Sequence, residues 1–315
     1  MVRNGAYITP GKTPDGGVPH PGAGGDHTFG PIFDEAYVSI GDSTVIMAGK
    51  KGSIIQNGDD EPFNWLGLFN SEKVDKGVKW KVSLPDGGHV IQVVSDLGNG
   101  VSVGAGVENL QGAGAAAGTA VGYIAYAGDS ITAHATFIAG GVLDGTVENY
   151  AIHAGFTGTF DMFRIRAAVA ADNTGYWNAL ATAEATFDMF KIAISGEAAR
   201  DSGAVGGTDF GVGASASATV TDGVTINLGG RYYSDASGPD GYQVAAQLVA
   251  AVTETITLTG EVGAYGNNTV PHTSLYYGAV EIAWAPGGGF TSSLKGEAIS
   301  NGAYRATFKA AKSFE

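Results

Sequence analysis

Charged side chains recur at every second position along extended segments of this sequence. Arg164 and Arg166, for example, alternate with Phe163 and Ile165, so the two guanidinium groups share one face of their segment. Charges of both signs on a water-facing surface can orient polar solutes and set a preference between cations and anions. The same charges could instead pair with one another and have no selective role. The residues that follow this pattern are Arg164, Arg166, Lys191, Arg231, Arg305 and Lys309, with Glu197, Glu261, Glu281 and Glu297.

A second acidic group, formed by Asp59, Asp60 and Glu61, lies in the connection 51–87, which is far longer than any other. Connections of this length are usually functional. If this loop folds inward, its carboxylates face the basic side chains and narrow the aqueous path between them. Two alternatives stay open: an ordinary surface loop, and a Ca²⁺ site, which clustered carboxylates allow but no ligand spacing supports. The basic residues expected opposite the loop are chiefly Arg164, Arg166, Arg231, Arg305 and Lys309.

The sequence contains no arrangement that predicts catalysis or a bound cofactor. No nucleophile–base constellation can be assembled, and Gly-rich runs such as 104–106 lack the lysine and the strand–loop–helix context of a phosphate cradle. We therefore expect no catalytic residue, no metal site and no enzymatic activity. The net charge of −14 argues against nucleic acid as a partner.

The elements that position the charged residues are β-strands. Ile256, Leu258 and Val262 share one face of their segment, whereas Thr257 and Glu261 share the other. Period two predicts strands, and strands of roughly ten residues with charge on one face are typical of a transmembrane β-barrel. A charge at mid-membrane on the lipid face costs about 2–4 kcal/mol, so we expect the charged face to line the lumen.

The expected fold is all-β, a transmembrane antiparallel up-and-down β-barrel. We expect about eighteen strands, with a count between about sixteen and twenty left open because strand boundaries are hard to predict. The chain 1–315 is then a single barrel domain, with 51–87 as an inward-folded constriction loop within it. From residue 97 onward, tight turns and longer loops alternate strictly. The expected strands lie near 2–9, 34–40, 44–50, 88–96, 100–109, 118–127, 130–139, 148–157, 160–170, 176–187, 189–199, 207–219, 223–234, 240–252, 255–265, 273–285, 289–299 and 303–314.

Aromatic residues gather near both ends of these strands, as in the interfacial belts of membrane barrels. The alternative, strand-end aromatics of a soluble β-sandwich, fits this many uniform hairpins poorly. One group lies beside the tight turns: Phe160, Phe163, Phe187, Phe190, Trp284, Phe290 and Phe314. The other lies near the longer loops: Tyr150, Tyr176, Trp177, Tyr232, Tyr242, Tyr276 and Tyr304.

Several segments resemble the alphaproteobacterial outer-membrane porins, the general porins of the Rhizobium and Brucella type. DEAYVSIGDS (34–43) and AGKKGS (48–53) resemble the hairpin before that family's constriction loop. LGNGVSVG (97–104) and VEN (107–109) resemble the hairpin after it, and YRATFKAAKSF (304–314) resembles the last strand. The chain departs from the family in adding Glu315 after the terminal aromatic residue and in its higher strand count.

The resemblance implies a water-filled channel for passive diffusion of small hydrophilic solutes and ions in a Gram-negative bacterial outer membrane. It also implies a homotrimer, with the lipid bilayer and lipopolysaccharide as further partners. Outward-facing small residues such as Gly260, Gly278, Ala246 and Ala306 suit barrel-to-barrel packing, although they suit lipid too. A substrate-specific channel for a sugar or another small polar nutrient is the alternative function.

Overall fold

The computed structural model describes residues 2–9, 32–56, 61–69, 87–111, 118–147, 149–201, 207–269 and 273–313. In this part of the chain the regular structure consists of eighteen β-strands and one short 3₁₀ turn, η2 (Val142–Asp144). No helix there is long and apolar enough to cross a membrane. The expectation of an all-β, up-and-down fold is confirmed, and the strands match the predicted ones in number and order.

Contacts between residues group the chain into two compact units. Strands β7 (Ile131–Gly140) and β8 (Asn149–Phe160) contribute residues to both units. Unit 1 holds β1 (Val2–Thr9), β2 (Ile32–Gly41), β3 (Thr44–Lys51), β4 (Gly88–Gly98), β5 (Val101–Glu108) and β6 (Thr119–Ala127). Unit 2 holds β9 (Phe163–Asp172), β10 (Trp177–Thr186), β11 (Phe190–Arg200), β12 (Asp209–Thr221), β13 (Val224–Ser234), β14 (Gly241–Ala251), β15 (Ile256–Asn267), β16 (Thr273–Gly287), β17 (Phe290–Ile299) and β18 (Tyr304–Lys312).

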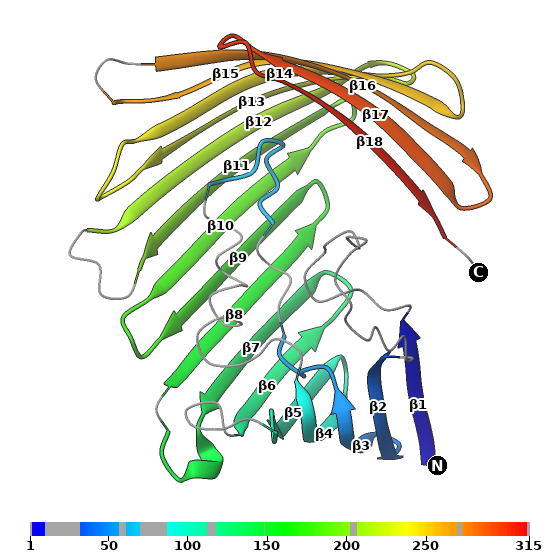
Figure 1. Cartoon of the computed structure of the whole chain (residues 1–315), viewed down its shortest axis with the longest axis vertical. Helices are drawn as coiled ribbons and strands as arrows, with labels where there is room; N and C mark the ends of the chain where they lie inside the picture. Colours follow the sequence, from blue (N-terminus) through cyan, green and yellow to red (C-terminus); the bar gives the residue numbers. More distant parts are fainter. Residues whose placement is uncertain are drawn as a thin grey trace, which may run out of the picture. The chain divides into compact units, whose positions relative to one another are not determined.

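Each strand of unit 2 pairs antiparallel with the next strand along the chain. Figure 1 shows β9 to β18 as successive neighbours, coloured from green to red. Strands β1 to β6 of unit 1 pair in the same consecutive way. This topology follows from the short connections, because a turn of two or three residues can join only antiparallel neighbours.

Tight turns fix the register of the hairpins. Asn99 and Gly100 form the two-residue loop between β4 and β5, with φ values of 53° and 79°. Positive φ at both positions is the requirement of a type I′ turn, for which Asn-Gly is the favoured sequence. Register then decides which side chains reach each face, because a slip of one residue would exchange the two faces.

The connection between β13 and β14 holds two carboxyl groups with lowered pKa values. Asp235 accepts a hydrogen bond from the Ser237 N–H at 2.8 Å, and Asp240 accepts one from the Tyr232 hydroxyl at 2.7 Å. These hydrogen bonds favour the charged form of each carboxyl, so they lower the pKa of both below the ordinary 3.8.

Because the folded-state pKa values are depressed, these hydrogen bonds stabilise the connection above pH 3.8, and their contribution is lost as the pH falls through the folded-state values. We expect amide hydrogen exchange at residues 235–238, corrected for the intrinsic rate, to accelerate between about pH 5 and about pH 2.5. The double variant Asp235→Asn, Asp240→Asn should lose most of this pH dependence. Unchanged protection in the wild-type protein at the lower pH would contradict the assignment.

Candidate functional site

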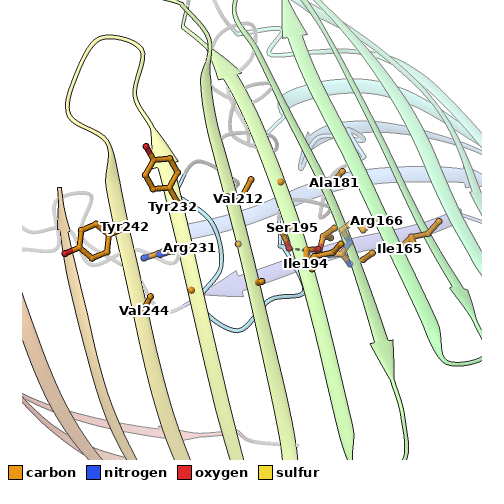
Figure 2. A pocket seen from close by; sticks show the side chains of 16 residues that line it. Ile165, Arg166, Ala181, Ile194, Ser195, Val212, Arg231, Tyr232, Tyr242 and Val244 are labelled. Carbon is orange, nitrogen blue, oxygen red and sulfur yellow. Dashed lines mark hydrogen bonds between the residues drawn. The ribbon is translucent and has the colours of Figure 1, made fainter. Parts of the chain in front are cut away.

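The two faces of the unit 2 sheet differ in chemistry. One face, here called the apolar face, carries large aliphatic and aromatic side chains that remain exposed: Ile194 is 60% exposed and Val212 57%. Part of it forms a groove of about 910 Å³ over β9 to β14. Figure 2 shows side chains that line this groove, among them Ile165 and Val244. Monomeric soluble proteins rarely expose so many neighbouring apolar side chains, so this face requires an apolar surrounding or partner.

The opposite face, here called the polar face, carries the charged residues that alternate along the sequence. In the register, Arg166 lies opposite Thr182, Thr182 opposite Ser195, and the same parity continues to Glu297 opposite Arg305. The residues predicted to line the lumen all share this parity, so they lie on one face of the sheet. They are Arg164, Arg166, Lys191, Glu197, Arg231, Glu261, Glu281, Glu297, Arg305 and Lys309.

Residues 61–69 of the long loop, here called the anchored segment, lie against the polar face of unit 2. The backbone N–H of Phe63 donates to Thr182 Oγ1 at 3.1 Å. The backbone N–H of Trp65 donates to Ser215 Oγ at 3.0 Å. Side-chain oxygens of β10 and β12 thus satisfy peptide donors that an irregular loop would otherwise leave unpaired.

Three charged side chains hold the two ends of the anchored segment. Arg166 Nη1 donates to the carbonyl oxygen of Glu61 at 2.8 Å, and Arg231 Nη1 donates to that of Leu68 at 3.0 Å. The backbone N–H of Phe69 donates to Glu197 Oε1 at 2.9 Å. Hydrogen bonds to charged groups are worth about 1.5–3 kcal/mol each, so these contacts hold the segment more firmly than hydroxyl contacts do.

Cation–π contacts between arginine side chains and phenylalanine rings add to this attachment. The Phe63 ring lies under two guanidinium groups, with its centroid 4.3 Å from Arg164 Cζ and 5.1 Å from Arg166 Cζ. The Phe69 ring lies 4.2 Å from Arg231 Cζ. Each such cation–π contact contributes about 0.5–2 kcal/mol, depending on desolvation.

Two glycines of the polar face let the anchored segment approach the sheet closely. A Cβ atom at Gly213 would lie 2.7 Å from Asn64 Nδ2, and one at Gly229 would lie 2.9 Å from Leu66 Cγ. Both distances are shorter than real Cβ contacts, so a side chain at either position would force the side chain of Asn64 or Leu66, or the segment itself, to shift.

The start of the same loop is attached to the polar side of unit 1. Ile54 N–H donates to Glu108 Oε1 at 2.9 Å. Gln92 Nε2 donates to the same oxygen at 2.8 Å and to the Gly52 carbonyl at 3.0 Å. Glu108 and Gln92 are both 0% exposed, so a buried acid–amide pair fixes the direction in which the chain leaves β3.

Of the three predicted acidic residues of the loop, the structure describes only Glu61. Asp59 and Asp60 lie outside the described residues. Glu61 contacts the wall through its carbonyl oxygen, whereas its side chain is exposed. No group of three or more His, Asp or Glu residues suited to a metal ion occurs in the described part of the chain, and the Ca²⁺ alternative at residues 59–61 stays untested.

Several predicted wall residues have partners within the sheet. Lys191 Nζ lies 3.2 Å from Glu184 Oε2, and Arg305 Nη2 lies 3.3 Å from Glu297 Oε1. Glu281 lies opposite Lys295 in the β16–β17 register. Lys309 is exposed on β18. Charge pairing on exposed strands contributes little stability.

Sequence reasoning missed the residues that receive the anchored segment. Thr182 and Ser215 are flanked by Ala181 and Ala183, and by Ala214 and Ala216, so a hydroxyl on a small-residue strand was the available signal. Tyr176 was expected in an exposed aromatic belt, but it is buried. Burial, helped by the negative charges of Asp201 and Asp172, raises the pKa of Tyr176 to about 12.

No protein-family model matches this chain, and no curated protein sequence matches it. Among solved structures it is similar to a porin refined at 1.8 Å resolution, with 11% identity, a TM-score of 0.48, and coverage of 71% of this chain and 92% of that chain. It is also similar to a mutant of the Rh. blastica porin, with 13% identity, a TM-score of 0.44, and coverage of 70% and 88%. A third similar structure is an anion-selective porin from Comamonas acidovorans, with 14% identity, a TM-score of 0.34, and coverage of 76% and 70%. These scores assign the chain to no family.

Proposed function

We propose that the chain is an outer-membrane porin, a transmembrane β-barrel through which small hydrophilic solutes and ions diffuse passively. The observation that carries this proposal is the inverted burial of the two sheet faces. Val262 is 62% exposed on the apolar face, whereas Glu197 is 5% exposed on the polar face beneath the anchored segment. A water-soluble sheet buries its apolar face, and an apolar exterior with a polar interior is typical of outer-membrane barrels.

The anchored segment serves in this proposal as the constriction of the channel. It covers the polar face of β9 to β14 and brings the loop beside Arg164, Arg166 and Arg231. Charges of both signs line the path, so ion selectivity is weak, and the carboxylates of residues 59–61 favour cations slightly. Passive diffusion requires neither a catalytic group nor a cofactor, and the protein acts as a channel rather than as an enzyme.

The proposal extends to membership of the alphaproteobacterial general porins and to a homotrimer in contact with lipid and lipopolysaccharide. Ala246, Gly260, Gly278 and Ala306 line a second apolar groove of about 890 Å³ on unit 2. A surface of small residues lets a neighbouring barrel approach closely. The sequence resemblance supports the family and the trimer.

Planar-bilayer recording of the detergent-purified protein tests whether it forms channels. A substitution at Gly229 tests whether the anchored segment narrows the channel. In Gly229→Val the new Cβ would lie 2.9 Å from Leu66 Cγ and 3.0 Å from Trp65 Cε3, so the segment should be displaced and single-channel conductance should rise. Gly230→Val is the matched control, since its Cβ would face Val244 Cγ1 at an ordinary 3.6 Å on the apolar face.

Two results would count against the proposal. A protein that is folded and heat-modifiable in detergent but forms no channels would overturn the porin assignment. Equal conductance in the Gly229→Val and Gly230→Val variants would leave the porin assignment standing but would overturn the constriction role of the anchored segment.

A further inference from the structure

Aromatic rings alternate with planar polar side chains along the polar face of β13 to β16. Tyr233, Tyr265 and Tyr277 have the same parity as Arg231, and Phe69 of the anchored segment joins them. Phe69 and Tyr233 have ring centroids 5.6 Å apart, and Tyr265 and Tyr277 have centroids 6.0 Å apart. Two aromatic pairs therefore lie on one water-facing surface, here called the aromatic row.

A chain of hydrogen bonds fixes the polar groups between the two aromatic pairs. Arg231 Nε donates to Gln243 Oε1 at 2.9 Å, and Gln243 Nε2 donates to the Tyr277 hydroxyl oxygen at 3.0 Å. The Tyr277 hydroxyl donates to Glu261 Oε1 at 2.9 Å, and Gln247 Nε2 donates to Glu261 Oε2 at 3.0 Å. Such a network positions guanidinium, amide and carboxylate groups before any ligand arrives, which lowers the entropy cost of binding.

Gly263 determines how the Tyr277 ring is presented. A Cβ at Gly263 would lie 2.5 Å from Tyr277 Cε1 and 2.6 Å from Cζ. The ring therefore lies across bare backbone on the neighbouring strand. A ring held against the wall in this way can offer its free side to a solute that moves along the face.

We propose that the aromatic row is a binding subsite for a neutral saccharide, a proposal that rests on the porin function because the solute reaches this face through the pore. Aromatic faces cover the apolar C–H side of a sugar ring, while Arg231, Gln243 and Glu261 can bind neighbouring hydroxyls. Binding sites of this kind combine aromatic lining with a few well-placed polar groups. The carboxylates of Glu197, Asp209 and Glu261 outnumber the guanidinium of Arg231 here, so an acidic saccharide is repelled.

The experiment uses maltotriose as the neutral probe and trigalacturonate as its acidic counterpart. In planar bilayers, maltotriose should reduce the ion current saturably, and calorimetry on the detergent-solubilised protein should give a matching affinity. Tyr277→Ala should raise the half-blocking concentration by about five- to tenfold through loss of one stacking face. Tyr276→Ala removes the adjacent ring, which is 64% exposed on the apolar face, and should leave the block unchanged.

The outcomes separate this inference from the porin proposal. Channels of normal conductance without saturable block by maltotriose, or with equal block in Tyr277→Ala and Tyr276→Ala, would overturn the subsite and leave the porin standing. Trigalacturonate binding as tight as maltotriose would overturn the preference for a neutral ligand. A folded protein without any channels would overturn both proposals together.

Discussion

Freeing both ends of the anchored segment should increase single-channel conductance more than any single substitution on the polar face. The variant for this is Arg166→Ala combined with Glu197→Ala, which removes the contacts to the Glu61 carbonyl and to the Phe69 N–H. The two charge-assisted hydrogen bonds together stabilise the seated segment by about 3–6 kcal/mol. Their loss should lower the ratio of seated to released segment by at least about a hundredfold.

The matched control for this variant is Arg166→Lys combined with Glu197→Gln, which retains a donor at one end and an acceptor at the other. Because the chain has no cysteine, a Trp65→Cys reporter can be added to both backgrounds. A charged thiol reagent should label it faster in the alanine background. Unchanged conductance together with unchanged labelling would show that these side chains do not hold the segment.

Reversing the charge at Arg164 should shift the channel strongly toward cations. Arg164 contacts Phe63 through its guanidinium face, and it borders the proposed constriction. A unit charge about 8 Å from a passing ion in water contributes roughly 0.5 kcal/mol, and about 0.1 M salt roughly halves this. Changing +1 to −1 therefore stabilises a cation and destabilises an anion by about 0.5 kcal/mol each, so the cation-to-anion permeability ratio should rise about fivefold.

The reversal potential under a salt gradient measures this ratio directly. Lys312→Glu makes the same change of charge at the end of β18 on the apolar face, and it should shift the reversal potential much less. The Arg164→Glu effect should also shrink at higher ionic strength, since screening shortens the range of the charge. Equal shifts in the two variants would indicate that net charge, rather than position at the constriction, governs selectivity.

The alternation of apolar and polar residues along each strand made the sheet and its two faces predictable from sequence. Segments such as Ile256 to Val262 allow a single register once the flanking turns are placed, because a slip of one residue would move Glu261 to the apolar face. Turn residues with a required backbone conformation, such as Asn99-Gly100, then fixed the hairpins. Facing and strand order therefore followed from local patterns that repeat along the chain.

The position of the anchored segment on the polar face was not predictable in this way. Trp65 and Ser215 are 150 positions apart, and Phe69 and Glu197 are 128 apart. In these contacts the loop contributes peptide N–H groups, which every residue except proline carries, so the sequence holds no distinguishing mark. Glu61 was expected to act through its carboxylate, but it contacts Arg166 through its carbonyl oxygen, which its residue type does not reveal.

The reliance on main-chain groups has a consequence for how such a channel can diversify. The wall binds the segment through peptide atoms of residues 61, 63, 65, 68 and 69. An exposed side chain such as that of Glu61 can therefore be exchanged without loss of the supporting contacts. In the proposed porin, single substitutions at exposed positions of the segment can therefore change solute preference while the barrel stays unchanged, and these positions are suitable for engineering a pore of chosen charge.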